Sequence, residues 1–291
     1  MLRFAALGDS VTSGYGDPMP GGGWRGWAAL LAEALPCDTS FHNLAVSGAR
    51  VADVAERQLP VALELRPHLA SVLAGMNDTL RGDYDPGDFG HRLNAVVAAL
   101  TAGGATVLTA RLPDPGRMFG LPGVIARPLG RRMAALNDAV DEIARRHATI
   151  HVDLAGGSAY TRTHWSVDRL HPSEVGHRFL AHRFASALLE AGHPVRRLPG
   201  LAATNPVPSL SERVWWMATK GNQWLLRRST DLLPTLVQLA AREWRAPGGE
   251  NALVAHEATD QRQSAPASTS GAAGTSARNG TDNSRPTLIQ T

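Results

Sequence analysis

The chain has 291 residues, a hydrophobic content of 43% and a formal net charge of +3. This length allows one large domain with appendages or two small domains, and the apolar content is sufficient for a sizeable core. The small net charge gives no reason to expect nucleic acid as a partner. Cys37 is the only cysteine, which excludes an internal disulfide and gives no sign of an oxidising compartment.

Short apolar runs alternate with stretches of helical periodicity as far as residue 190. The expected strands are residues 4–7, 40–44, 69–74, 106–110 and 149–152. The expected helices are residues 24–35, 51–65, 88–102, 129–147 and 173–190, the last with a cap at Ser173. This alternation predicts an α/β fold in which a parallel sheet of about five strands carries helices on both faces.

The composition changes beyond residue 198, so residues 1–198 are predicted to form the α/β domain. Residues 199–245 are rich in tryptophan, leucine and arginine, which predicts an amphipathic helical extension. Three roles are open for it: docking on the domain, pairing with another chain, or peripheral membrane contact through residues 209–245. Gly221 and Pro234 would divide it into short helices, which favours docking. Residues 246–291 have few large apolar side chains and are expected to be a disordered, low-complexity tail.

The first expected strand leads directly into the sequence GDSVTSG at residues 8–14. A serine hydroxyl is a poor nucleophile unless the backbone holds it exposed beside a base, and a glycine-flanked turn after a strand allows this. Loops that follow parallel strands share one edge of a sheet. We therefore expect Ser10, Gly48 and Asn77, which each follow an expected strand, to lie side by side.

A base for Ser10 is available in the pair Asp168 and His171, which are three residues apart ahead of the last helix. Asp168 can accept from one ring nitrogen of His171, which leaves the other nitrogen to take the serine proton. The oxyanion of an acyl-transfer reaction also needs donors. The candidates are the backbone N–H groups of Ser10 and Gly48 and the side-chain amide of Asn77. Asp9 is expected to cap the turn rather than to act in catalysis.

The same region offers residues with metal-ligand spacing. His164 lies four residues before Asp168, His171 lies three after it, and His177 and His182 follow. A tryptophan, a proline and a glycine interrupt any continuous helix here, and a metal site would leave the serine motif without a role. We therefore expect neither a metal nor another cofactor.

A segment rich in proline and glycine, residues 112–128, follows the fourth expected strand. It is expected to be a loop that overhangs the catalytic edge of the sheet. Its apolar residues Met118, Phe119 and Leu121 are candidates for contact with the acyl chain or the leaving group, and a purely structural surface loop is the alternative.

Taken together, the GDS turn with Gly14, then Gly48, the GMND sequence ending at Asp78 and the Asp168–His171 pair resemble the blocks of the SGNH (GDSL-type) hydrolase superfamily over residues 3–192. This resemblance implies a flavodoxin-like three-layer α/β/α fold and ester hydrolysis through an acyl-enzyme. It also implies that Ser10 is nucleophile and oxyanion donor, that Gly48 and Asn77 complete the oxyanion hole, that His171 is the base and that Asp168 orients it.

The predicted function is therefore a serine esterase for small to medium acyl esters. Two alternatives stay open, namely an acyltransferase that uses the same site and a membrane-interface or binding module on a catalytically retired hydrolase fold. Met1 lies directly before the first expected strand without the pattern of a signal peptide, and no convincing membrane span is present, so we expect a cytoplasmic location. A small-molecule ester is the expected partner, and the oligomeric state is left open.

Overall fold

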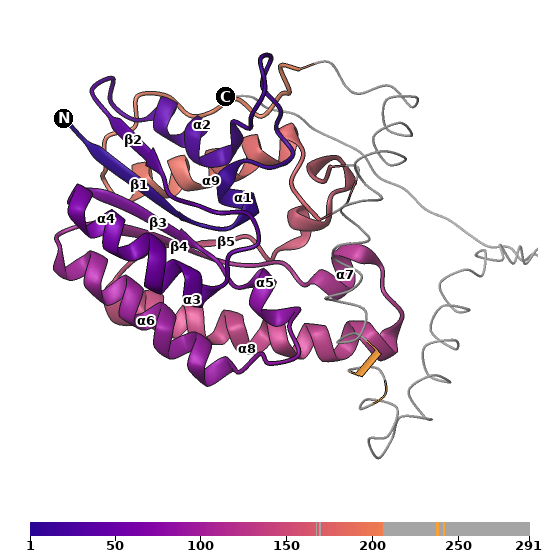
Figure 1. Cartoon of the computed structure of the whole chain (residues 1–291). Helices are drawn as coiled ribbons and strands as arrows, with labels where there is room; N and C mark the ends of the chain where they lie inside the picture. Colours follow the sequence, from indigo (N-terminus) through magenta and orange to yellow (C-terminus); the bar gives the residue numbers. More distant parts are fainter. Residues whose placement is uncertain (167, 169, 206–236, 239–240, 242–291) are drawn as a thin grey trace, which may run out of the picture. The chain divides into compact units, whose positions relative to one another are not determined.

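The computed structural model describes residues 1–166, 168, 170–205, 237–238 and 241 (Figure 1). A five-stranded sheet forms its centre, with the strands in the order β2-β1-β3-β4-β5. All neighbouring strands are parallel. The strands are β1 (Arg3–Gly8), β2 (Ser40–Asn43), β3 (Leu69–Leu73), β4 (Thr106–Arg111) and β5 (Ile150–Asp153). The chain reverses its winding direction between β1 and β3, where ligands bind in doubly wound sheets.

Helices cover both faces of this sheet. The α-helices are α1 (Ser10–Ser13), α2 (Gly26–Ala34), α3 (Val51–Asp53), α4 (Leu59–Leu65), α5 (Met76–Thr79), α6 (Pro86–Ala102), α7 (Pro115–Phe119), α8 (Gly123–His147) and α9 (Glu174–Glu190). A π-helical turn, η1 (Val54–Gln58), joins α3 to α4, and the short 3₁₀ helices η2 (Gly157–Tyr160) and η3 (Arg162–His164) follow β5.

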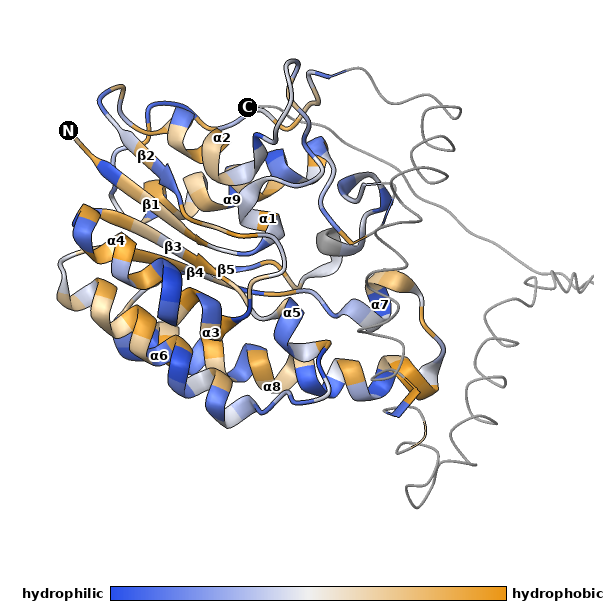
Figure 2. Ribbon diagram, viewed as in Figure 1, coloured by the Kyte–Doolittle hydropathy of each residue, from blue (hydrophilic) through white to orange (hydrophobic). Residues whose placement is uncertain are grey.

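The alternation of side chains along each strand divides the core into two layers. On β1, Ala5 and Leu7 pack with residues of α3, α4, α6 and α8 on one face, whereas Phe4 and Ala6 pack under α2 and α9 on the other. Both faces are covered, so the central strands β1 and β3 are mostly apolar, with Ser71 as a buried polar residue on β3, and both strands are largely orange in Figure 2. This arrangement confirms the predicted flavodoxin-like three-layer α/β/α fold.

Two expectations about the helices need correction. Residues 112–128 were expected to form a loop, but they contain α7 and the first residues of α8, with Pro128 inside that helix. Proline normally interrupts a helix because it lacks an N–H group. Here Leu129 is fully buried with Leu80, and Ile125 packs against the same pair, so tertiary packing outweighs the local cost. The single helix expected over residues 51–65 is instead interrupted by the π turn η1.

The described part of the chain continues past α9 as far as residue 205. Pro199 accepts a hydrogen bond from His182, and Gly200 accepts one from Arg178, so this segment runs along α9. Apart from residues 199–205, 237–238 and 241, the predicted extension lies outside the described residues, as does the whole predicted tail. In the described part of the chain, no helix combines the length and the apolar character needed to cross a membrane.

Candidate active site

The turn that carries Ser10 is built by the end of β1 and the start of α1. Asp9 is the N-cap of α1, and its carboxylate accepts from the backbone N–H of Val11 at 3.0 Å, as expected from its position in the turn. Ser10 is the first residue of the helix, so its own N–H has no carbonyl one turn earlier to bind. The chain enters this turn through Gly8, where an added Cβ would lie 2.3 Å from the carbonyl oxygen of Leu73.

A buried glutamine fixes the strand just before this turn. The Gln58 side chain accepts from the N–H of Gly8 at 2.8 Å and donates to its carbonyl at 2.9 Å. Gln58 is the last residue of the π turn η1. Single π turns inside helices occur frequently at functional sites. In this molecule, the turn brings an amide to both backbone groups of a residue two positions before Ser10.

Ser10, His171 and Asp168 form a continuous chain of contacts. The Oγ of Ser10 lies 2.9 Å from Nε2 of His171, and Nδ1 of His171 lies 2.7 Å from Oδ2 of Asp168. The side chains of His171 and Asp168 are both only 4% exposed. Because the carboxylate can only accept, Nδ1 carries the proton in the neutral ring and Nε2 is left to accept from the serine.

The loop around Asp168 keeps this carboxylate ionised. Burial by itself would raise the pKa of Asp168, but hydrogen bonds from His171 and Ser166 and the electrostatic interaction with the His171 ring outweigh it and hold the pKa below its ordinary value. The other carboxylate oxygen accepts from the backbone N–H groups of Leu170 and His171, each at 3.0 Å. The same side chain therefore shapes the loop and orients the histidine.

An aromatic side chain holds the imidazole from a further side. The Tyr15 ring packs on the His171 ring with centroids 4.4 Å apart, and Trp24 packs on Tyr15 at 4.5 Å. The fully buried His177 anchors the Tyr15 backbone, because its Nε2 donates to the Tyr15 carbonyl at 3.0 Å and its Nδ1 accepts from the N–H of Trp27. Burial lowers the pKa of His177 to about 4, so the ring is neutral near pH 7.

The three candidate oxyanion donors come together at the ends of neighbouring strands. Gly48 follows β2 with φ +84°, a conformation that favours glycine. Asn77 lies in α5 after β3, and its side-chain amide donates to the carbonyl of Ala49 at 3.1 Å and to the carboxylate of Asp9 at 3.2 Å. Asn77 thus links the Ser10 turn to the Gly48 turn, and its amide faces protein acceptors in this structure.

Asp78 anchors the segment that follows Gly48. Its two carboxylate oxygens accept from the backbone N–H of Val51 at 3.3 and 3.2 Å. Burial raises the pKa of Asp78 to about 6, against the opposing effects of the Val51 hydrogen bond and the nearby Arg50. The GMND sequence therefore supplies two side chains that hold the Gly48 segment in place.

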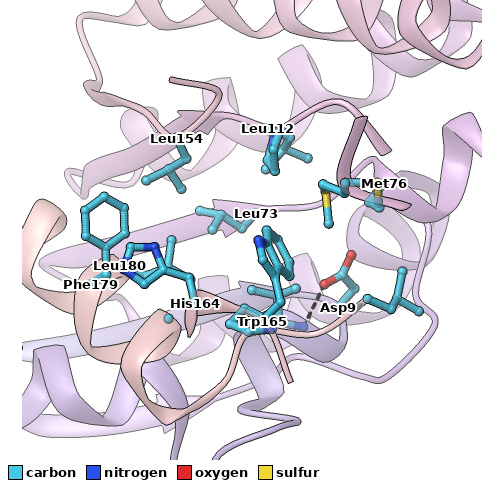
Figure 3. A pocket seen from close by; sticks show the side chains of 15 residues that line it. Asp9, Leu73, Met76, Leu112, Leu154, His164, Trp165, Phe179 and Leu180 are labelled. Atoms are coloured by element: carbon cyan, nitrogen blue, oxygen red, sulfur yellow. Dashed lines mark hydrogen bonds between the residues drawn. The ribbon is translucent and has the colours of Figure 1, made fainter. Parts of the chain in front are cut away.

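An apolar cavity of about 80 Å³ adjoins this constellation (Figure 3). Of the three residues predicted to contact the substrate, Met118 lines this cavity. Leu121 instead packs against Leu80 and Leu129, and Phe119 is not among the lining residues. The cause is the unexpected helix α7, which turns only part of this segment toward the cavity.

A sequence model of the GDSL-like lipase/acylhydrolase family matches residues 6–179, which is more than half of the chain. The chain belongs to this family. No curated protein matches the GDSL-like chain. Membership in the GDSL-like lipase/acylhydrolase family supports the conclusion that this protein is a hydrolase that acts on esters.

Solved structures resemble this GDSL-like hydrolase in fold. TesA has a TM-score of 0.53 and 24% identity, with 64% of this chain and 97% of that chain covered. Axe2, an acetylxylan esterase from Geobacillus stearothermophilus, has a TM-score of 0.52 and 20% identity over 64% and 94% of the two chains. The lipase/acylhydrolase from Enterococcus faecalis has a TM-score of 0.53 and 20% identity over 69% and 100%. At these identities, the comparisons show the fold and not the substrate.

The residues considered for a metal site in the GDSL-like hydrolase face different partners. His171 contacts Ser10 and Asp168, whereas the His164 ring stacks on the Phe179 ring at a centroid distance of 4.8 Å. His182 contacts the carbonyl of Pro199. Within the described residues, no three histidine, cysteine, aspartate or glutamate side chains converge in a way that could hold a metal ion.

Sequence reasoning missed three residues that support the site of the GDSL-like hydrolase, namely Gln58, Tyr15 and His177. Gln58 gave no usable signal, because a polar residue in an amphipathic helical stretch is expected on the exposed face, whereas the structure buries it. Tyr15 directly follows the GDSVTSG motif. His177 had been weighed only as a metal ligand, and its actual partners lie about 150 residues away in sequence, beyond the reach of any local pattern.

Proposed function

We propose that this GDSL-like hydrolase is a serine esterase that cleaves small to medium acyl esters through an acyl-enzyme intermediate. The observation that carries the proposal is the uninterrupted contact from Ser10 Oγ to His171 Nε2 at 2.9 Å and from His171 Nδ1 to Asp168 at 2.7 Å. A nucleophile, a base and a group that orients the base are the three parts that acyl transfer by serine needs. Family membership supports the same chemistry.

In the first half-reaction, Ser10 Oγ attacks the ester carbonyl carbon while His171 Nε2 takes the hydroxyl proton. Asp168 remains ionised and stabilises the imidazolium that forms. When the tetrahedral intermediate collapses, the bond to the alcohol oxygen breaks and His171 returns the proton to that oxygen. Water then attacks the acyl-enzyme with the same base, and the acid is released with Ser10 restored.

The negative charge on the carbonyl oxygen is stabilised by the N–H groups of Ser10 and Gly48 and by the Asn77 amide. In the proposed mechanism, the oxyanion replaces the longer of the two Asn77 contacts, the one to Asp9 at 3.2 Å, while the contact to Ala49 holds the amide in place. Donors aimed at a charge that develops only in the transition state lower the barrier without tightening substrate binding equally.

Replacing the nucleophile tests the proposal. Ser10→Ala is expected to lower kcat for a nitrophenyl acetate ester at least about 10³-fold, because the residual oxyanion donors cannot replace the nucleophile. Ser13→Ala, which removes a hydroxyl from the same short helix, is the matched control and should keep most of the activity. Thermal unfolding of both variants checks that they are folded. Wild-type turnover by folded Ser10→Ala would refute the assignment.

A further inference from the structure

The Tyr15 side chain connects the two segments that supply the proposed nucleophile and the proposed base. Its backbone N–H donates to the carbonyl of Ser10 at 3.0 Å, which ties it to the nucleophile turn. Its ring packs on the His171 ring with centroids 4.4 Å apart and planes inclined at 49°. A further aromatic ring, that of Trp24, packs on Tyr15 at a centroid distance of 4.5 Å. The Tyr15 ring is therefore held against the imidazole that is proposed to move the proton.

The backbone that follows Tyr15 lies directly on the loop that carries the base. Gly16 has φ +106°, and a Cβ added there would lie 2.1 Å from the carbonyl oxygen of Pro172, the residue after His171. The Tyr15 carbonyl accepts from Nε2 of the buried His177 at 3.0 Å. The backbone on both sides of the Tyr15 ring is therefore fixed relative to the base.

The ring of Tyr15, rather than its hydroxyl, is the part that can assist the reaction. Burial, together with the nearby charge of Asp168, raises the pKa of Tyr15, so the phenol keeps its proton at neutral pH and cannot act as the base. An aromatic ring, by contrast, attracts a cation that lies within about 6 Å of its centroid. His171 becomes such a cation each time it takes a proton from Ser10 or from water.

We propose that Tyr15 is a positioning residue whose ring holds the His171 imidazole against Ser10 and stabilises the imidazolium that forms in both half-reactions. This inference rests on the proposed esterase function and adds a residue to its machinery. The neutral and the protonated imidazole both touch the ring, but only the protonated form is stabilised by the electrostatic attraction. The contact therefore lowers the barrier of each half-reaction without tightening substrate binding equally.

Two substitutions at Tyr15 test the role of the ring. Tyr15→Leu is expected to lower kcat and kcat/KM for nitrophenyl acetate together, by about five- to thirtyfold, because the lost interaction exists only in the transition states. KM should change less than about twofold. Tyr15→Phe keeps the ring and should hold kcat within about threefold of wild type. A wild-type kcat in folded Tyr15→Leu, a loss confined to KM, or an equal loss in Tyr15→Phe would overturn the inference.

Fluorination separates the charge distribution of the ring from its shape. Phenylalanine and trifluorophenylalanine, each placed at Tyr15, have similar shapes, but the fluorine atoms withdraw electron density from the ring face. We expect the trifluorinated protein to have a kcat at least about threefold below that of Tyr15→Phe, with a similar KM. Equal kcat values would mean that the ring only packs against His171, and the proposed stabilisation of the imidazolium would be wrong.

An aromatic pair elsewhere on the sheet supplies the matched control. Phe41 on β2 packs on Phe4 of β1 with centroids 5.2 Å apart, toward the amino ends of the two strands. Phe41→Leu removes the same kind of ring contact, so it is expected to lower the free energy of unfolding while kcat and KM stay within about twofold of wild type. Denaturant unfolding of all variants measures their stability. A loss of kcat in Phe41→Leu as large as that in Tyr15→Leu would show that lost stability, not the contact with His171, is the cause.

The failure of this inference and the failure of the proposed function give different results. If no ester is cleaved in a Ser10-dependent manner, the esterase function itself is wrong and the role of Tyr15 falls with it. If nitrophenyl acetate is cleaved through Ser10 but the Tyr15 variants keep the wild-type kcat, only the role of Tyr15 is wrong. The comparison of the two ring-bearing variants decides the question even if Tyr15→Leu does not fold.

Discussion

At the scale of single residues, the candidate site depends on side chains that each make several contacts. The Asp168 carboxylate accepts from the His171 ring, from the backbone of Leu170 and His171, and from the Ser166 hydroxyl. Charge-assisted hydrogen bonds of this kind are stronger than neutral ones, and they explain why a buried acid keeps a lowered pKa. In sequence, only the spacing to His171 was visible.

Asp168→Asn is expected to lower kcat by about 10³- to 10⁴-fold with a smaller change in KM. The new amide can donate to Nδ1, which favours the tautomer with the proton on Nε2, so the ring can no longer take the Ser10 proton. Steady-state kinetics on a nitrophenyl acetate ester measure this. Ser166→Ala removes one donor but leaves the carboxylate, and should cost less than about tenfold. Activity of folded Asp168→Asn within tenfold of wild type would exclude the orienting role.

At the scale of elements, the position of the Ser10 turn depends on a close contact between α1 and α2. Gly14 is the C-cap of α1 and Gly26 begins α2, and a Cβ added at Gly26 would lie 2.2 Å from the Cα of Gly14. The backbones can approach this closely only because neither residue has a side chain. Gly26 also has φ +71°, which is strained for other residues.

Two alanine substitutions separate the close contact from the backbone strain. Gly104 has φ +86° but open space around it, so Gly104→Ala is expected to cost only about 1–2 kcal/mol of unfolding free energy from strain. Gly26→Ala is expected to cost at least about 2 kcal/mol more, because α1 and α2 must also move apart. Urea unfolding measures both values. Equal losses of unfolding free energy in the two variants would show that α1 and α2 can move apart without a measurable penalty.

The bounds of the helices and strands show which elements hydrophobic periodicity can predict and which it cannot. The strands were placed to within about two residues. For β1, β3 and β4 the reason is that each is a mostly buried apolar run whose length and bounding residues are visible locally. The first residues of α8 were missed because Pro128 is locally unfavourable in a helix, and only the packing around Leu129 compensates for it. The π turn that presents Gln58 was missed because hydrophobic periodicity does not distinguish it from an α-helix.

At the scale of the whole molecule, one buried carboxylate ties the segment after α9 to the start of that helix. Glu174 accepts from Arg25 at 3.0 Å and from Arg178 at 2.9 Å. It also accepts from the backbone N–H groups of Thr204 at 2.7 Å and Asn205 at 2.9 Å. Glu174 is only three residues beyond His171 in sequence, so this cluster also supports the end of the loop that carries Asp168 and His171.

Stability should depend on the ionisation of Glu174. Burial alone would raise its pKa, but the hydrogen bonds from Thr204, Asn205 and Arg178 lower the pKa to about 2, from an ordinary value of 4.5. A lowered pKa in the folded state means that this stabilisation is complete above pH 4.5 and is lost as the pH falls toward 2.

Glu174→Gln is therefore expected to lower the unfolding free energy by about 2 kcal/mol at pH 7, with a smaller difference from wild type at pH 3. Denaturant unfolding at the two pH values measures this difference. Glu64→Gln, at an exposed position on α4, is the control and should have little effect at either pH. A difference from wild type that does not shrink at low pH would mean that the charge of Glu174 is not what stabilises the cluster.

The amino-acid sequence alone was enough to predict the fold class, the edge of the sheet where the candidate site lies, and the residues that form the chain of contacts from Ser10 to Asp168. These features follow from local patterns, because strand order and loop position are set by apolar periodicity and by the turns that end each strand. The tertiary structure decided the supporting contacts of Gln58, Tyr15 and His177, the helix around Pro128 and the apolar cavity. Each of these joins residues far apart in the chain, and their packing has no signature in any single segment.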